Sequence, residues 1–308
     1  MASDFAPSNG AAQYDDGLWY AWSATVLAPL MECPQKWQWG TAEGRKRPAR
    51  ALDFGKAAHT GWETLDYWRL KAAPKEEALD RALKRALWFA DQWTTPAEPR
   101  RTRDMLGRLL TAYADELYEG AVQPVEREGR AANEDHWKLP GGTYPDGRPW
   151  VLCGSLDSRV TFAGQHYVRE RKTTTAGLQT YWKSYVPRVQ LWLYDWAESI
   201  MFPQGHAGVI LEVARIGETK TWGPEVEFDR RIFARSAWQR GAFLMSLNAA
   251  IARYWGQWKA DKFLLNETAC GNYGGCPFRR ACDAPTEAER QVVLDMEQPR
   301  GVVFNPLA

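Results

Sequence analysis

The chain has 308 residues, of which 45% are hydrophobic and 25% are charged, and its formal net charge is +1. This is the composition of an ordinary globular protein, long enough for one large or two small domains. The small net charge neither favours nor excludes nucleic-acid binding. No apolar run approaches the roughly 20 residues that cross a membrane.

Residues 1–19 lack the basic region followed by an apolar region that marks a secretory signal. We therefore expect a disordered lead-in at 1–19 and a cytoplasmic protein. In that reducing setting the five cysteines are not expected to form disulfides.

Helices are predicted throughout the segment that follows. Apolar residues recur at spacings of three and four along Ala51–Leu70, which is typical of one buried helix face. A helical segment at 52–119 therefore precedes every predicted strand. The predicted helices span Ser23–Cys33, Ala51–Leu70, Pro74–Trp93 and Arg100–Tyr118.

The second half of the chain mixes strands with helices, which predicts a mixed α/β fold. A polar stretch rich in glycine and proline, 140–147, is interpreted as a loop. No G-x-x-x-x-G-K-[ST] motif occurs, so the chain carries no P-loop motor. The predicted strands are Ala121–Arg127, Leu152–Val160, His166–Lys172, Ala207–Val213 and Thr219–Phe228, and the predicted helices are Gln179–Met201 and Asp229–Lys262.

We expect a single domain at 20–285, followed by a tail at 286–308. Within the domain, the sheet core would occupy 121–228. A long helix and a group of cysteines would occupy 229–285.

Two predicted strands bring acidic residues close together. Asp157 lies near the end of one arm of a hairpin, and Glu170 and Lys172 lie two apart on the other arm, hence on one face. Carboxylates are the ligands that Mg²⁺ prefers, and a lysine beside the ion can orient the attacking water. The pattern predicts a divalent-metal site. The competing interpretation is three charged residues that happen to end strands.

Three further side chains are candidates for the same site. His59 flanks the apolar stripe of its helix, where a histidine is either a hydrogen-bonded core residue or a metal ligand. As a ligand it would favour Mn²⁺ over Mg²⁺, because imidazole is the softer donor. Gln190 and Tyr194 lie one helical turn apart, and they either border the core or hold a phosphate or a catalytic neighbour.

The cysteines give a second signal. Cys270, Cys276 and Cys282 fall within thirteen residues, and Cys33 could supply a fourth thiolate. Four thiolates suit Zn²⁺ or an iron–sulfur cluster. Gaps of five residues are long for a zinc ribbon, so a cluster is favoured. Three unrelated buried thiols is the competing interpretation, and Cys153, inside a strand, is interpreted as a core residue.

Six short motifs follow one another along the chain. Each one alone is weak, whereas six in this order form a specific pattern. They are Cys33-Pro34, G-x-x-x-H at Gly55–His59, G-x-x-D at Gly154–Asp157, E-x-K at Glu170–Lys172, Q-x-x-x-Y at Gln190–Tyr194, and the three C-terminal cysteines.

Together these motifs resemble the RecB-like branch of the PD-(D/E)XK nuclease superfamily. The chain is similar in particular to its iron–sulfur members, namely the RecB-like exonucleases that accompany CRISPR spacer acquisition, their phage relatives and the AddB nuclease domain. The resemblance covers Ser23 to Cys282. It departs in one place, because the family often has C-x2-C-x5-C where this chain has five residues in both gaps.

The resemblance implies a restriction-endonuclease-like α/β core, in which a mixed sheet is flanked by helices. Lys172 would position the water that attacks the scissile phosphate, and Gln190 and Tyr194 would orient the DNA and the active site. The resemblance also implies one or two Mg²⁺ or Mn²⁺ ions bound by His59, Asp157, Glu170 and the backbone carbonyl of Arg171.

A [4Fe–4S] cluster is implied as well, with zinc as the less favoured alternative. The cluster would act as a staple that ties the N-terminal segment to the C-terminal end of the domain. Its ligands would be Cys33, Cys270, Cys276 and Cys282.

Our hypothesis is a metal-dependent DNA exonuclease that prefers single strands and serves recombination, repair or phage DNA processing. Its DNA would be single-stranded or have free ends, and a helicase or recombination partner would have to unwind duplexes. The alternatives are a catalytically silent DNA-binding or assembly module with the nuclease fold, and a structural zinc protein. The predicted backbone contacts to DNA are Arg45, Arg47, Arg100 and Arg101.

Overall fold

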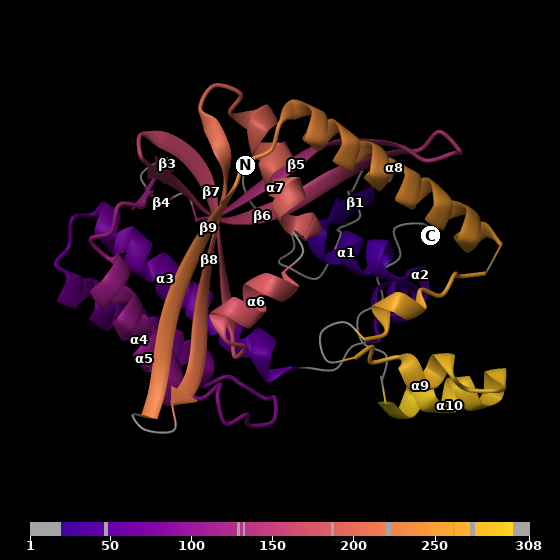
Figure 1. Ribbon diagram of the computed structural model, residues 1–308, viewed down its shortest axis with the longest axis horizontal. Coiled ribbons are helices and arrows are strands. Elements are labelled where there is room, and N and C mark those ends of the chain that lie inside the picture. Colours follow the sequence, from indigo (N-terminus) through magenta and orange to yellow (C-terminus); the bar gives the residue numbers. More distant parts are fainter. Residues whose placement is uncertain are drawn as a thin grey trace.

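A seven-stranded mixed sheet lies between two layers of helices (Figure 1). The computed structural model describes residues 20–45, 49–127, 130–131, 133–185, 188–219, 223–260, 262–271 and 275–297. The strands of the sheet are β1 (Tyr20–Ser23), β2 (Gln123–Pro124), β5 (Asn133–Thr143), β6 (Pro149–Phe162), β7 (Gln165–Thr174), β8 (His206–Thr219) and β9 (Gly223–Phe233).

The central path of the sheet runs β1-β6-β7-β8-β9, and β2 and β5 also pair with β6. Strand β1 is parallel to β6 and β7 is parallel to β8, whereas the other pairs are antiparallel. The turn between β6 and β7 uses Ala163 and Gly164, both with positive φ, as a tight hairpin requires. A separate small sheet pairs β3 (Glu126–Arg127) with β4 (Arg130–Ala131).

One face of the sheet is covered by α3 (Arg50–Leu70), α4 (Lys75–Ala90) and α5 (Arg103–Leu117). Their apolar side chains pack on Ala214 and Ile216 of β8. The contact between α3 and α5 is close, because a Cβ at Gly61 would lie 2.6 Å from the Leu110 side chain. Glycine is therefore needed at that position of an otherwise strong helix.

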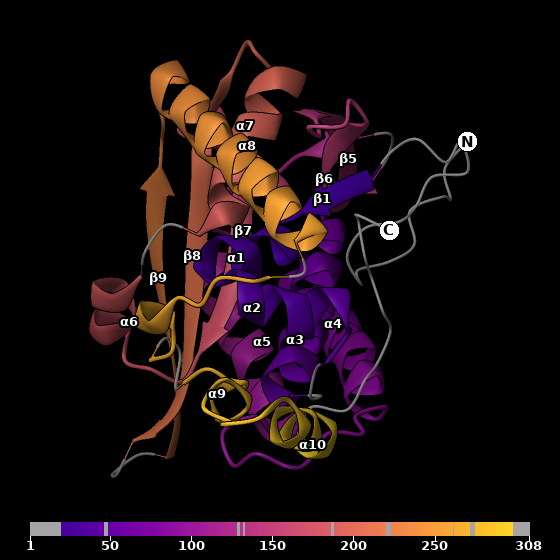
Figure 2. The same cartoon turned by 90° about the vertical axis from the view of Figure 1, so that its right-hand side faces the viewer.

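The opposite face is covered by α1 (Ala24–Glu32), α6 (Leu178–Ser184), α7 (Val189–Met201) and α8 (Ala237–Lys259). Its core includes Val209, Leu211 and Val213 of β8, which alternate with the residues that face α3 and α5. Figure 2 shows α6 beyond β8 and β9, on the side away from α3, α4 and α5. None of the helices in the described ranges is long and apolar enough to cross a membrane.

The two ends of the described chain pack against each other. The N-terminal part is α2 (Pro34–Trp37) with a π-helical stretch at Gln38–Ala42. The C-terminal part is a 3₁₀ turn at Glu267–Ala269 with α9 (Arg279–Cys282) and α10 (Glu287–Glu297). The rings of Trp39 and Phe278 lie 5.7 Å apart, and the Asn266 side chain donates to the Glu32 carbonyl at 2.7 Å.

Four sequence predictions about the elements are wrong. Strand β1 precedes the helical segment. The predicted helix 179–201 is two helices, α6 and α7. Residues 229–233 extend β9, because the capping box of Ser236 and Gln239 starts α8 only at Ala237. The loop predicted at 140–147 begins inside β5, where side chains at Gly141 and Gly142 would collide with the Trp150 ring.

Candidate active site

The predicted acidic residues meet where two strands of the sheet part. Strands β6 and β7 pair as far as Ser158 opposite Arg169, and β7 then continues along β8 to Thr174. At this fork the backbone N–H of Arg171 donates to the Asp157 carboxylate at 2.8 Å. The side chain of Asp157 thereby replaces a ladder partner and is held beside the end of β7.

Glu170 is fully buried at the fork. Neither of its carboxylate oxygens accepts a hydrogen bond within the described part of the chain, although Lys172 forms an ion pair with Oε1. Burial and the neighbouring Asp157 raise the pKa of Glu170, against the opposing effect of Lys172. Two carboxylates placed in this way repel each other unless a cation lies between them.

His59 reaches the same fork from α3. Its Nε2 lies 3.1 Å from the carbonyl oxygen of Arg171, and its Nδ1 lies 3.4 Å from Asp157 Oδ2. Burial lowers the pKa of His59 despite the Asp157 charge, which favours the neutral imidazole that binds metals. Both oxygens that face His59 belong to the predicted metal-ligand set.

Gln190 and Tyr194 face the acids from α7. The Gln190 amide donates to the Tyr194 hydroxyl at 2.8 Å. Burial raises the pKa of Tyr194, and the negative charges of Glu170 and Asp157 add to the shift. The Tyr194 hydroxyl therefore stays protonated close to both carboxylates and can donate a hydrogen bond into the site.

Sequence reasoning missed two residues that reach this site. The first is Arg188, whose positive charge acts on Lys172. Burial lowers the pKa of Lys172, Glu170 and Asp157 raise it, and the charge of Arg188 opposes these two acids. The Glu170 charge also acts on Tyr185. Tyr185 and Arg188 lie just before α7, so their closeness to Gln190 in the sequence was the signal that could have found them.

The donor chemistry around the fork fits a hard divalent ion, because it combines two carboxylates, an imidazole and a backbone carbonyl. In the ranges that the structure describes, no three His, Cys, Asp or Glu side chains already form a metal site. An ion would have to draw these groups closer, and the Glu170 carboxylate would then exchange part of its contact with Lys172 for the ion.

The four predicted cluster cysteines also come near one another. Burial raises the pKa of Cys282 to about 11, and the thiols of Cys276, Cys33 and Cys270 add to the shift. The backbone N–H of Cys276 donates to the Cys270 carbonyl at 2.8 Å. All four are free thiols, as is Cys153, which is buried in β6.

The structure does not support a DNA contact by Arg45. This side chain is 1% exposed and its guanidinium pairs with Asp295 of α10, so it ties the two ends of the chain together. Arg101 is paired with Glu98 in its own loop, whereas Arg100 is exposed. Arg47 lies outside the described residues.

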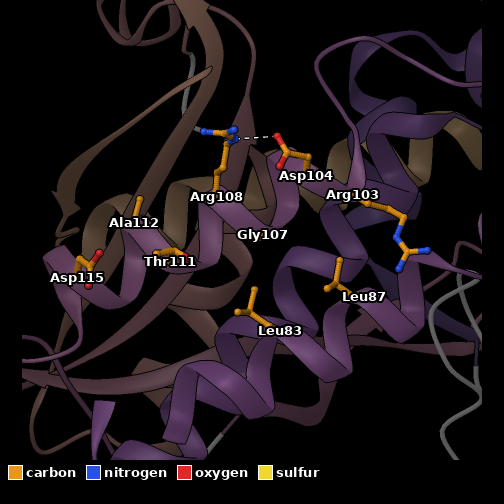
Figure 3. A pocket seen from close by; sticks show the side chains of 9 residues that line it. All are labelled: Leu83, Leu87, Arg103, Asp104, Gly107, Arg108, Thr111, Ala112 and Asp115. Atoms are coloured by element: carbon orange, nitrogen blue, oxygen red, sulfur yellow. Dashed lines mark hydrogen bonds and ion pairs between the residues drawn. The ribbon is translucent and has the colours of Figure 1, made fainter. Parts of the chain in front are cut away.

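A separate groove of about 700 Å³ lies between α4 and α5 (Figure 3). Half-buried apolar side chains such as Leu83 and Leu87 line it, and exposed charged groups surround them. Those charges pair with each other, as Arg108 does with Asp104 at 2.7 Å. None of the predicted site residues lines this groove, so it carries none of the chemistry described above.

Comparisons with known proteins give one family. A sequence model described as the PD-(D/E)XK nuclease superfamily matches residues 21–283. Among solved structures, the chain is similar to a "Putative exonuclease" from Eubacterium rectale, with 11% sequence identity and a TM-score of 0.41. That similarity covers 81% of this chain and 87% of the other. No curated protein matches the chain.

Proposed function

The chain belongs to the PD-(D/E)XK nuclease superfamily, and from that premise we propose that it hydrolyses phosphodiester bonds in DNA with a divalent metal ion. The observation that supports the metal most directly is the Glu170 carboxylate. It is fully buried and close to Asp157, and Lys172 is its ion-pair partner in the described structure. One ammonium group does not offset two adjacent carboxylates, so the site favours a further cation.

The metal-binding groups in this proposal are Asp157, Glu170, His59 and the carbonyl of Arg171. When bound, Mg²⁺ or Mn²⁺ supplies positive charge for the scissile phosphate and makes a water molecule more acidic. The residues of the chain fix where that chemistry occurs. Asp157 is held by the Arg171 N–H, and the Arg171 carbonyl faces His59.

Lys172 is proposed to hold the attacking water and to offset charge on the phosphate. Its ammonium is paired with Glu170, and the net effect of its acidic neighbours is to raise its pKa, so it carries its charge at neutral pH. The Tyr194 hydroxyl, supported by Gln190, would donate a hydrogen bond to a phosphate oxygen or to a carboxylate of the site.

We propose further that the enzyme is an exonuclease that prefers single-stranded DNA and acts in recombination, repair or phage DNA processing. Arg100 is exposed and remains a proposed backbone contact. Because the sequence holds no P-loop motor, a helicase or recombination partner would supply single strands from duplex DNA. The free cysteines are consistent with the proposed cytoplasmic location.

Cleavage of end-labelled single-stranded DNA with Mn²⁺ tests the activity. Wild type should release mononucleotides or short products from an end, whereas Asp157→Ala and Lys172→Ala should not. Equal activity in all three proteins would remove the site assignment. Failure of wild type on every DNA and RNA substrate would favour the alternative, a binding module that keeps only the nuclease fold.

A [4Fe–4S] cluster on Cys33, Cys270, Cys276 and Cys282 is part of the proposal. The four cysteines and the packing of the two chain ends favour it, although no three of these thiols already form a metal-binding group among the described residues. The absorption spectrum and iron content of anaerobically purified protein test it. Cys153→Ser should keep the iron and Cys33→Ser should lose it, and a colourless protein with one zinc would favour the zinc alternative.

A further inference from the structure

The metal-binding face of the sheet continues beyond the fork to the edge strand. In the register of β7, β8 and β9, Glu170 pairs with Leu211, and Leu211 pairs with Arg231. All three side chains therefore point to the same face, and Arg231 lies two strand spacings, about 10 Å, from the position of Glu170. Residues of β9 that share this face with Arg231 stand in line with the candidate site.

Aromatic rings from α6 and from Tyr185, the residue after it, lie next to this face of β9. Tyr181 and Tyr185 stack with ring centroids 5.4 Å apart, and Tyr185 continues to Phe233 of β9 at 6.0 Å. Both tyrosines are half-buried, so part of each ring remains accessible to solvent. Burial raises the pKa of Tyr185, and the neighbouring Tyr181 and Glu170 add to the shift.

Three arginines lie over aromatic rings in or beside this row. The guanidinium of Arg231 lies 4.3 Å from the centre of the Trp182 ring, and that of Arg235 lies 3.9 Å from the Trp192 ring. Arg188 lies 5.9 Å from the Tyr185 ring. An arginine that lies over an aromatic ring can still use its N–H groups to bind a second, negatively charged partner.

Asp229, an acidic residue that shares this face of β9 with Arg231, is already engaged. Asp229 accepts a hydrogen bond from the Trp182 indole N–H at 2.6 Å and another from the backbone of Arg230 at 2.7 Å. Arg231 itself is exposed, and the described ranges contain no ion pair that involves it. The charge of the row is therefore positive, which suits a polyanion.

We infer that Tyr181, Tyr185, Arg188, Arg231 and Arg235, here called the α6–β9 track, bind the single strand of DNA that leads to the metal site. Bases would stack on the tyrosine rings and phosphates would lie on the arginines. The inference rests on the proposed function and gives it a substrate path.

The chemistry of the track selects a single strand over a duplex. Stacking on a protein ring requires an unpaired base whose face is accessible, which a duplex does not offer. Rings that can stack and arginines that can bind phosphates, placed beside one another, suit the bases and phosphates of one strand. Strand β9 ends the central path of the sheet, so no further strand of the described sheet pairs beyond it.

Fluorescence anisotropy with a labelled single-stranded oligonucleotide, in EDTA to prevent cleavage, tests the track. Tyr181→Ala should weaken binding by about 5- to 100-fold, since stacking contributes roughly 1–3 kcal/mol per base. Tyr181→Phe, which keeps the ring, should bind like wild type. Arg231→Ala should weaken binding and reduce the slope of log affinity against log salt by about 0.7.

Arg85 and Trp88 of α4 give a matched control. Both are exposed, and they lie in the helical layer on the other side of the sheet from α6 (Figure 2). They therefore provide an exposed arginine and an exposed aromatic ring, like those of the track, but away from the proposed DNA path. Arg85→Ala and Trp88→Ala should leave the affinity unchanged, and losing affinity there but not in the track would overturn the inference.

The outcomes separate this inference from the proposed function. Normal cleavage by wild type together with unchanged affinity in Tyr181→Ala and Arg231→Ala would overturn the track and leave the nuclease proposal standing. Track-dependent binding without cleavage of any nucleic acid would uphold the track and overturn the proposed activity. Arg231→Glu, an exposed substitution, guards against a loss caused by misfolding, and it should abolish binding without lowering the thermal midpoint.

Discussion

The two faces of strand β7 carry charged residues in alternation, but their surroundings are opposite. Arg169 and Arg171 point toward α3 and α5, where Asp66 accepts hydrogen bonds from both. Glu170 and Lys172 point the other way and pair with each other, beside the second carboxylate of Asp157. We call the first the complete face, because its arginines are paired with Asp66. We call the second the incomplete face, because its two carboxylates have a single lysine between them.

The complete face is a buried network of acids and bases. Arg169 also donates to Ser158 at 3.0 Å and to the Tyr113 hydroxyl at 3.3 Å, and Glu212 lies 3.7 Å from Arg171. Buried charges of this kind cost free energy unless each is paired and hydrogen-bonded. The network fixes the backbone of β7, and the Arg171 carbonyl and the Glu170 side chain are fixed with it.

The two faces of β7 therefore have different roles: one stabilises the fold, and the other carries the proposed catalytic residues. The period of two in a strand places neighbouring residues on opposite faces, so a single E-R-K sequence can serve both purposes. The residues that stabilise the site lie on the face that a ligand does not reach. Substitutions on the two faces should therefore have different effects, which the following experiments compare.

The largest effect is expected on the complete face. Asp66→Ala leaves two buried arginines without their shared acceptor, and the free energy of unfolding should fall by about 3–5 kcal/mol. Denaturant unfolding measures this change. Asp80→Ala, which removes an exposed pair with Lys84, is the control and should change little. A loss as small as that of the control would show that the network does not stabilise the fold.

The next effect is expected on the incomplete face. Glu170→Gln should lower the rate of DNA cleavage by about 10²–10³-fold, because a charge needed in the transition state is lost. The unfolding free energy of the metal-free variant should be no lower than that of wild type, since the amide oxygen can still accept from Lys172 and the repulsion with Asp157 is removed. Marked destabilisation of Glu170→Gln would make Glu170 a structural residue.

A smaller effect concerns the ion itself. Mn²⁺ at about 100 times its dissociation constant should raise the unfolding free energy of wild type by about 2.7 kcal/mol. The measurement is thermal or denaturant unfolding with and without Mn²⁺, after treatment with EDTA. Asp157→Asn with Glu170→Gln should abolish this stabilisation, and its persistence in the double variant would place the ion elsewhere.

The smallest effect is expected from one hydroxyl. Tyr194→Phe removes a single hydrogen-bonding group from the site and should reduce the cleavage rate by about 10-fold. Tyr254→Phe is the control, because it removes another buried hydroxyl, bonded to Gln38 at 3.2 Å, away from the fork. Equal rates in both variants would exclude Tyr194 from the reaction.

Patterns of apolar residues predicted much of the fold. The helix at 51–70, the hairpin with its turn at Ala163 and Gly164, and the apolar strand at 207–213 each lie within observed elements. The strand β1 was not predicted, because its few residues gain their partners only from β6, which is distant in the sequence. The part of β5 that contains Gly141 and Gly142 was predicted as a loop, because glycine is typical of loops. In the structure these glycines instead leave room for the Trp150 ring.

The candidate site was predicted only in part for a similar reason. The spacing of Asp157, Glu170 and Lys172 follows from local strand geometry, and the E-x-K pattern is visible without any structure. Arg45 resembled a surface cation in the sequence but is buried against Asp295, 250 residues away. Charge in a sequence does not reveal whether a side chain meets water or an acid from the other end of the chain.

The sequence by itself determined the family, the order of its motifs and the face on which Glu170 and Lys172 lie, because these depend on residue type and on the period of a strand. Only the tertiary structure decided which charges are satisfied. It brought Asp66 and Glu212 to the arginines of one face, and it left Glu170 of the other face beside Asp157. Electrostatic satisfaction depends on distances across the fold, which a linear pattern does not contain.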